Sequence, residues 1–510
     1  MISDNNKRIA KNTLMLYIRM VLLMLVNLYT ARIVLQALGV EDYGLYSIVG
    51  AVVIFLGFIN NSMSAASQRF LSFYQGKGDE EKLSSVFNSI LVVQGIISLI
   101  ILLLGETCGV LYIQYVLNVD ASKIPIAHIV YQFSLLSFIS KTLNVPYNAS
   151  IVANERMDAF ALISIAEGLL QLIVVFVLQL LPEHRLVAYA AMMFATMVII
   201  QCCYHIYSAY HFKECKIRRN WDKVVIREIF AYSGWNLLAS LSVVLVQQGV
   251  NMILNSFFGV IVNAARGISF QVNGAIASLS GSFQQSINPQ IIKSYAEKER
   301  EKMYALVMNG TRFSFYLLLV LIVPVFFNMK SLLQLWLGNV PPYTEMFCRL
   351  VLLNHFSVVL ADSLRVGTMA TGRIRNFQVV ISVLYMLNVP LSIIGLYIYP
   401  NPYLTAYIMI GLYILAFIAS LIIASQIIGM SIMVFIKKTL IPVLSVMSLS
   451  FLCACIIDKL IVNSSIIILT GRMIAMVIMS FIVIYFVGIT NKERIAAVNF
   501  IKKKMKRFKF

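Results

Sequence analysis

The run SVFNSILVVQGIISLIILLL at positions 85–104 is twenty residues long and contains no charged side chain. A transmembrane helix needs about 20 consecutive, mostly apolar residues, because the hydrocarbon core of a bilayer is about 30 Å thick. The run therefore predicts a membrane-spanning helix, and the same pattern recurs along the rest of the chain.

The composition extends this interpretation to the whole sequence. Of the 510 residues, 60% are hydrophobic and only 12% are charged, whereas a soluble domain carries about 25% charged residues. No polar linker divides the sequence, so lipid must be the solvent of this chain. The formal net charge of +19 does not indicate nucleic-acid binding, because the basic residues fall between apolar runs and not on one soluble face.

Apolar runs of spanning length predict an all-α, polytopic membrane protein with about fourteen transmembrane helices. The predicted spans are 12–38, 44–66, 85–104, 126–147, 159–181, 186–209, 229–257, 261–284, 304–327, 345–370, 378–399, 403–428, 439–457 and 464–488.

The distribution of basic residues gives the orientation of these spans. The loops on one side hold only Lys123, Arg185, Lys330 and Lys459, whereas most of the other Lys and Arg residues fall on the opposite side. Because basic loops stay in the cytoplasm, both termini are predicted to be cytoplasmic, including the basic tail 491–510.

Two pairs of segments indicate an internal repeat with an offset of about 220 residues. GVEDYGLYSIVG at 39–50 corresponds to GVIVNAARGISFQVNG at 259–274, and LSFYQGKGDEEKL at 71–83 corresponds to IIKSYAEKEREKM at 291–303. A shift of six spans keeps the orientation, so the repeat is parallel, with its axis along the membrane normal. We expect a six-helix lobe at 1–210, a second at 211–430 and two additional helices at 431–490, with the substrate at the lobe interface.

The charged residues inside the predicted spans are mainly cationic. Charged side chains at membrane depth usually face a wet cavity or a partner, and arginine binds phosphate with a bidentate fork. The set therefore favours an anionic ligand. Its cations are Arg19, Arg32, Lys141, Arg266, Arg312, Arg349, Arg365 and Arg472, and its acids are Glu167 and Asp362.

Several of these residues have a simpler alternative. Arg19 lies about eight residues inside its span, too deep for snorkelling alone, whereas Arg32 near the outer end can snorkel. Lys141 is expected to snorkel inward. Asp362 and Arg365 can neutralise each other at i, i+3, or Asp362 can titrate as a coupling group. Glu167 is either a proton carrier or a neutral buried acid.

The seventh and eighth predicted spans are rich in amides. The candidates for a wet surface that contacts sugar are Asn236, Gln247, Asn251, Gln271 and Asn273. The alternative is that these amides only hold helices together by hydrogen bonds within the membrane.

Motifs of other chemistries are missing from the sequence. There is no GxxxxGK[ST], HExxH or GxSxG, the five histidines form no ligand pattern, and the seven cysteines form no CxxC pair. We expect no cofactor, no bound metal and no enzyme activity, which leaves transport driven by an ion gradient, the membrane potential or the substrate gradient.

Four short stretches resemble bacterial polysaccharide-transporter flippases, which move O-antigen and capsule repeat units. They are LGVEDYGLY at 38–46, NERM at 154–157, YSGWN at 232–236 and VNAARG at 262–267. These flippases share the multidrug/oligosaccharidyl-lipid/polysaccharide exporter superfamily with the multidrug extruders of the MATE type. The resemblance implies a MATE-like fold, a cationic central cavity and an inner-membrane location.

By the same resemblance, the substrate is an undecaprenyl-diphosphate-linked oligosaccharide, and Arg19 and Arg266 are its diphosphate contacts. Membrane lipids and other polysaccharide assembly proteins, such as a polymerase or a chain-length regulator, would be the partners. The rival hypotheses are a cation-coupled drug extruder, which would need an acidic, aromatic-lined cavity, and a polysaccharide polymerase or ligase, for which the outer loops are short.

Overall fold

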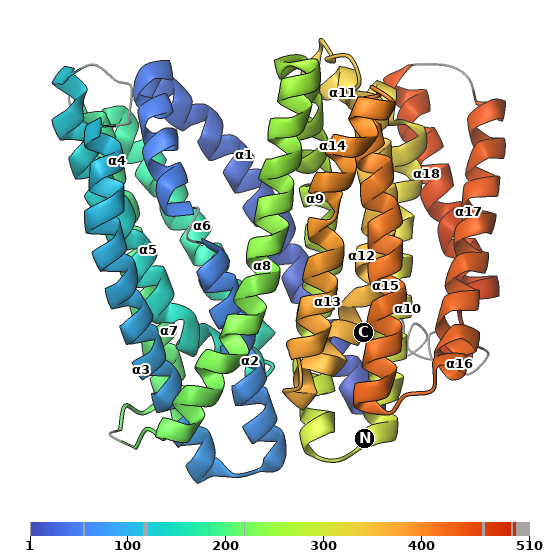
Figure 1. Cartoon of the computed structure of the whole chain (residues 1–510), viewed down its shortest axis with the longest axis horizontal. Coiled ribbons are helices and arrows are strands. Elements are labelled where there is room, and N and C mark those ends of the chain that lie inside the picture. Colours follow the sequence, from blue (N-terminus) through green and yellow to red (C-terminus); the bar gives the residue numbers. More distant parts are fainter. Residues whose placement is uncertain are drawn as a thin grey trace, which may run out of the picture. The chain divides into compact units, whose positions relative to one another are not determined.

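The computed structural model describes residues 2–54, 57–115, 121–182, 184–218, 220–461, 465–490 and 493–495. Over these residues the chain is all-helical (Figure 1). The tail segment 496–510, predicted to be cytoplasmic, lies outside the described residues.

The helices of the first part of the chain are α1 (Ile2–Ile54), α2 (Gly57–Lys77), α3 (Glu80–Leu104), η1 (Gly105–Gly109), α4 (Val110–Tyr115), η2 (Ala121–Lys123), α5 (Ile124–Ala153), α6 (Met157–Leu180), α7 (Arg185–His211), η3 (Lys213–Cys215) and α8 (Lys223–Phe258). Those of the second part are α9 (Val260–Ala296), α10 (Arg300–Phe327), α11 (Met329–Leu337), α12 (Thr344–Thr371), α13 (Arg375–Met386), α14 (Asn388–Ile398), α15 (Leu404–Ile428), α16 (Ile432–Phe435), η4 (Ile436–Leu440), α17 (Ile441–Leu460), α18 (Ile466–Val483) and η5 (Ile484–Gly488).

Ten helical segments within the described part of the chain are long and apolar enough to cross a membrane. They comprise α3, α6, α7, α8, α10, α12, the pair α13–α14, α15, the stretch α16–α17 and α18 with η5. The other predicted spans fall on α1, α2, α5 and α9. In α1 the apolar segment Asn12–Asn27 is shorter than the ten segments named above. The all-α, multi-pass membrane fold is thereby confirmed.

The outward faces of the apolar helices are built for lipid. Leu452 and Ile456 on α17 are 60% and 52% exposed, and Ile474 and Ile478 on α18 are both 53% exposed. Exposed rows of aliphatic side chains are unfavourable in water but not in hydrocarbon. A helix also suits hydrocarbon because it satisfies the hydrogen bonds of its own backbone.

The predicted repeat has a counterpart in the backbone. Gly39 interrupts α1 with φ 80°, and Gly259 separates α8 from α9 with φ 76°. At the second pair of segments, Gly78 (φ 71°) and Lys298 (φ 63°) both have left-handed backbones. Left-handed residues therefore recur at an offset of 220 residues in both matched segments.

One predicted span is interrupted, and one predicted loop contains a helix. The span 378–399 consists of α13 and α14, which meet at Leu387. Pro390 has no amide hydrogen to donate to the carbonyl four residues earlier, which explains an interruption at this point. The predicted loop after 327 contains the short helix α11, which the sequence pattern did not reveal.

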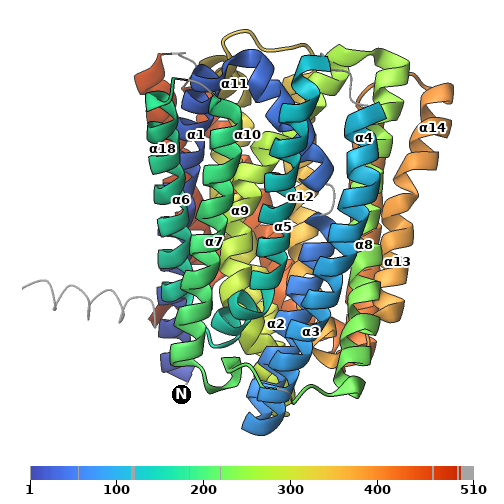
Figure 2. The same ribbon diagram turned by 90° about the vertical axis from the view of Figure 1, so that its left-hand side faces the viewer.

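The chain forms two compact units. Unit 1 comprises Met1–Val244, Gln285–Met303 and Met369–Val379, and unit 2 comprises Leu245–Gln284, Tyr304–Thr368 and Val380–Phe510. In unit 1, α5, α6 and α7 run side by side (Figure 2), and the core includes Phe70, Phe87 and Tyr131. In unit 2, one core cluster contains Leu254 and Phe347. The lobe boundaries proposed from the sequence remain a prediction.

Candidate functional site

Half of the cations in the predicted spans have a carboxylate partner. The Arg349–Glu345, Arg472–Asp458 and Arg365–Asp362 ion pairs measure 2.9, 2.9 and 3.3 Å, and Arg312 pairs with Glu493. The excess of positive charge within the membrane is therefore smaller than the predicted spans indicated. Three of the four acids, Glu345, Asp458 and Glu493, lie outside the predicted spans or at their ends, so the sequence pattern did not count them.

Arg19, Lys141 and Arg266 remain without a carboxylate within 4.0 Å among the residues that the structure describes. Arg19 and Lys141 belong to unit 1, and Arg266 belongs to unit 2. Arg32 lies on α1, but its side chain is outside the described residues. The convergence of Arg19 and Arg266 on one chamber remains a prediction.

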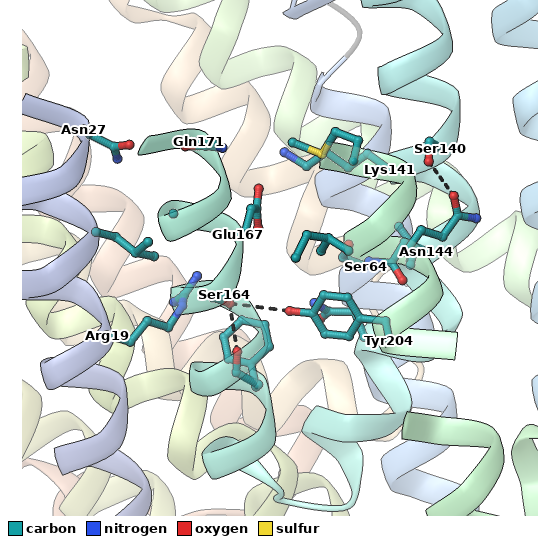
Figure 3. Close-up of a pocket in the computed structure, with 18 residues that line it drawn as sticks. Arg19, Asn27, Ser64, Ser140, Lys141, Asn144, Ser164, Glu167, Gln171 and Tyr204 are labelled. Atoms are coloured by element: carbon teal, nitrogen blue, oxygen red, sulfur yellow. Dashed lines mark hydrogen bonds between the residues drawn. The ribbon is translucent and has the colours of Figure 1, made fainter. Parts of the chain in front are cut away.

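Unit 1 contains a polar cavity of about 350 Å³. Helices α1, α2, α5, α6 and α7 supply its walls, and Figure 3 shows their side chains directed towards a common space. Its polar lining residues are Arg19, Asn27, Ser64, Ser140, Lys141, Asn144, Asn148, Ser164, Glu167, Gln171, Gln201 and Tyr204.

Helical spacing explains how these residues share one space. On α1, Arg19, Leu23 and Asn27 are spaced by four residues, and on α5, Ser140, Asn144 and Asn148 have the same spacing. Side chains at i and i+4 lie above one another on one helix face. Each helix therefore directs one row of side chains towards the cavity, and all of these side chains are polar except Leu23.

Arg19 is held by an aromatic ring and retains hydrogen-bonding capacity. Its guanidinium carbon lies 4.5 Å from the centroid of the Phe160 ring, an arrangement that stabilises the cation. Its buried Nε atom has no hydrogen-bond partner among the described residues. Across the cavity, the buried acceptor Asn144 Oδ1 also has no hydrogen-bond partner among those residues. An unpartnered buried donor costs free energy that a ligand acceptor can recover.

Other polar groups of the cavity are tied to one another. The Ser164 hydroxyl lies 3.4 Å from the Tyr204 hydroxyl, and Ser140 donates a hydrogen bond to Gln201 Oε1. These contacts fix the wall formed by α5, α6 and α7, because each bond joins neighbouring helices.

Lys141 and Glu167 complete the charge of the cavity. Lys141, for which we expected inward snorkelling, lines the cavity, and Glu167 lies between it and Arg19 (Figure 3). Two cations and one carboxylate leave the site with an excess of one positive charge. The amides that line it are neutral donors and acceptors, which suits hydroxyl-rich ligands.

Arg266 organises a second polar cluster, in unit 2. Its Nη1 donates to the Gln247 carbonyl oxygen at 3.2 Å and to Asn251 Oδ1. The guanidinium carbon lies 4.7 Å from the centroid of the Phe270 ring, and the residue is only 5% exposed. The structure thus brings three predicted site residues together, with Arg266 bound by neutral groups only.

The remaining predicted site residues are more scattered. Asn236 is buried, and its Oδ1 accepts a 2.6 Å hydrogen bond from Gln378, as in the packing alternative. Gln271 is exposed, and Asn273 has a buried Oδ1 without a partner among the described residues. Asp362 is engaged by Arg365, so any coupling role would have to break that pair.

Comparison with solved structures identifies the fold. A multidrug resistance transporter of the MATE family and MOP superfamily, in an outward-facing conformation, superposes with a TM-score of 0.69 at 13% identity, over 83% of this chain and 96% of the other. A MATE transporter in a bent conformation gives a TM-score of 0.73 at 12% identity, over 84% and 96% of the two chains. The predicted MATE-like fold is confirmed.

A third similar structure is a MOP superfamily transporter from Pyrococcus furiosus, whose binding pocket is described as having reverse polarity, suggesting a different function. It superposes with a TM-score of 0.63 at 14% identity, over 84% of this chain and 97% of the other. No protein-family model matches the chain. No curated protein matches it either.

Proposed function

We propose that this protein is a flippase that moves an undecaprenyl-diphosphate-linked oligosaccharide across a bacterial inner membrane by alternating access. The observation that supports this proposal most directly is the polar cavity of unit 1, in which Arg19 and Lys141 have no carboxylate within ion-pair distance among the described residues. A diphosphate would supply the missing negative charge, and arginine is suited to its oxygens.

The remaining lining suits the sugar part of such a substrate. Asn27, Asn144, Asn148, Gln171 and Gln201 offer amide donors and acceptors around the cations. Hydroxyl groups of a sugar can pair with both kinds of amide atom. A volume of about 350 Å³ accommodates a diphosphate and part of the first sugar, while the polyprenyl chain would stay in the bilayer.

The charge of the cavity also distinguishes this proposal from its main rival. A drug extruder for organic cations would need an excess of acidic groups, because a cation is not attracted to a site with a formal charge of +1. Glu167 is the observation that favours the rival, since it places one carboxylate among the lining residues. The MATE fold alone is compatible with either substrate.

The test is transport by the purified chain in vesicles that contain a fluorescent polyprenyl-diphosphate oligosaccharide. We expect wild-type protein to exchange the lipid between leaflets, and the Arg19→Gln and Lys141→Gln variants to lose at least about tenfold in rate, the equivalent of about 1.4 kcal/mol. The matched control is Arg373→Gln, because Arg373 is an exposed residue in the turn between α12 and α13.

Two results would count against the proposal. Equal flipping by wild type and both cavity variants would remove the cavity from the mechanism. Uptake of ethidium by the wild type, abolished in Glu167→Gln, together with no lipid flipping, would favour the drug extruder.

A further inference from the structure

Glu167 is the one acidic residue among the residues that line the unit 1 cavity. It projects from α6 towards the space between α1 and α5, with Arg19 on one side and Lys141 on the other (Figure 3). A carboxylate at membrane depth requires a compensating function, because an ionised group there is costly.

Glu167 is close enough to both cations to interact electrostatically, but not to bind either. Its carboxylate is within Coulombic range of Lys141 and of Arg19, yet no ion pair within 4.0 Å joins it to them in the described part of the chain. The three charges therefore surround a gap in which a further group can fit.

We infer that Glu167 is the resident counter-ion of this cavity: it competes with an anionic ligand for Arg19 and Lys141, and it takes up one proton from water when that ligand binds. The inference rests on the proposed function, because it assumes that the ligand is a diphosphate diester.

Charge balance leads to this conclusion. With Glu167 ionised, the lining carries a formal charge of +1, and a diphosphate diester of charge −2 would leave the occupied cavity at −1. Uptake of one proton by Glu167 returns it to neutrality. In a partly buried site, two negative charges about 4 Å apart repel each other by about 4 kcal/mol, so protonation of Glu167 is expected to accompany binding of the diphosphate.

The groups that face Glu167 determine the sign of this effect. They are Arg19 from α1, Lys141 from α5, the Tyr204 hydroxyl from α7 and the neutral Ser64 from α2. Arginine and lysine side chains in water remain charged between about pH 5 and pH 8. Glu167 is therefore the group whose titration would make anion binding stronger at low pH.

The experiment measures binding of a water-soluble, short-chain prenyl-diphosphate N-acetylglucosamine to the full-length protein in detergent, by calorimetry. The charge of this diester does not titrate between about pH 5 and pH 8. Repeating the titration in two buffers of different ionisation enthalpy gives the number of protons taken up.

We expect wild-type protein to bind the probe about tenfold more tightly at pH 5 than at pH 8, which corresponds to about 1.4 kcal/mol. Because the logarithm of the affinity changes with pH by the number of protons taken up, this corresponds to an uptake that averages about one third of a proton over that range. Glu167→Gln should bind tightly at both values and take up no proton. Lys141→Gln should bind the probe more weakly than the wild type at both pH values. The matched control is Asp158→Asn, the same kind of change in the first turn of α6 but outside the cavity.

The outcomes separate the inference from the function on which it rests. Binding by wild type with no proton uptake, or an unchanged affinity in Glu167→Gln, would overturn the counter-ion and leave the flippase standing. Absence of probe binding at either pH would overturn both. If Glu167→Gln does not fold, unchanged binding by Lys141→Gln would still refute the inference.

Discussion

Replacing Lys293 with methionine is expected to destabilise the protein by about 3 kcal/mol or more, because a buried carboxylate loses its cation. The carboxylate is that of Glu155, in the turn between α5 and α6, whose side chain is 1% exposed. Its Oε1 accepts a 3.0 Å hydrogen bond from Lys293 Nζ, and its Oε2 accepts one of 2.9 Å from Gln290. Asn12 on α1 donates to the Glu155 carbonyl oxygen at 3.1 Å.

The two partners should not be equivalent. The Lys293 side chain is 16% exposed, so in Glu155→Gln the ammonium group can move towards water, and we expect a loss of about 1–2 kcal/mol. The doubly substituted protein should be more stable than Lys293→Met alone, because it removes both charges of the Glu155–Lys293 pair and not only the cation. The resulting coupling energy is expected to be about 1–3 kcal/mol.

The assay is denaturant unfolding in mixed micelles, with the four proteins of the double-mutant cycle compared at one pH. Lys302→Met is the control, because Lys302 forms ion pairs with Glu297 and Glu299 at 3.6 and 2.6 Å but is 41% exposed. An exposed pair contributes at most about 1 kcal/mol. Equal, small and additive losses for Lys293→Met, Glu155→Gln and the control would refute this reasoning.

Three further predictions concern the backbone, a thiol and a helix end. Gly78 and Lys298 both have a positive φ, so Gly78→Ala should destabilise the protein by about 1–2 kcal/mol, whereas Lys298→Gly should stabilise it. Denaturant unfolding measures both changes, and equal effects of the same sign would contradict this. Burial raises the pKa of the Cys215 thiol from 9.0 to about 12, so less thiolate is present at any given pH. In a variant whose other cysteines, including the exposed Cys202, Cys203 and Cys455, are replaced by serine, maleimide labelling of Cys215 at pH 8 should be about a thousandfold slower than in the denatured chain; fast labelling of Cys215 in that folded variant would be inconsistent with this. Arg69 Nε and Nη2 donate 3.3 Å hydrogen bonds to the carbonyl oxygens of Met369 and Ala370, respectively, at the end of α12. Arg69→Lys should therefore destabilise the protein by about 1–3 kcal/mol. An unchanged unfolding midpoint would rule that contribution out.

The fold was predictable because lipid imposes a simple rule on sequence. Apolar runs of spanning length, such as 85–104, fall on helices in the structure. The offset of 220 residues was visible as weak similarity, and it reappears in the positive φ values at Gly39 and Gly259. Helices α1, α2 and α5, on which predicted spans also fall, contribute polar side chains to the cavity.

The site was predicted only in part. Arg19 and Glu167 were selected because charges stand out against an apolar background, but Asn144, Asn148 and Gln171 were not. Their signal was present as i, i+4 polar spacing on α5 and i, i+4 spacing from Glu167 on α6. Sequence alone could not show which neighbouring helices face these stripes.

The carboxylate partners of most intramembrane cations could not be predicted from the sequence either. Arg312 pairs with Glu493, which is 181 positions away, and no local pattern links two residues at such a separation. In contrast, the Asp362–Arg365 pair followed directly from i, i+3 spacing.

The central claim is that the cationic cavity of unit 1 receives the diphosphate end of a lipid-linked sugar. Photocrosslinking tests it most directly, using full-length protein in vesicles and a polyprenyl-diphosphate oligosaccharide with a photoreactive group on its first sugar. We expect crosslinked peptides to come from α1, α5, α6 and α7, and we expect Arg19→Gln and Lys141→Gln to reduce their yield. Crosslinks confined to other helices, with a yield unaffected by these substitutions, would contradict it.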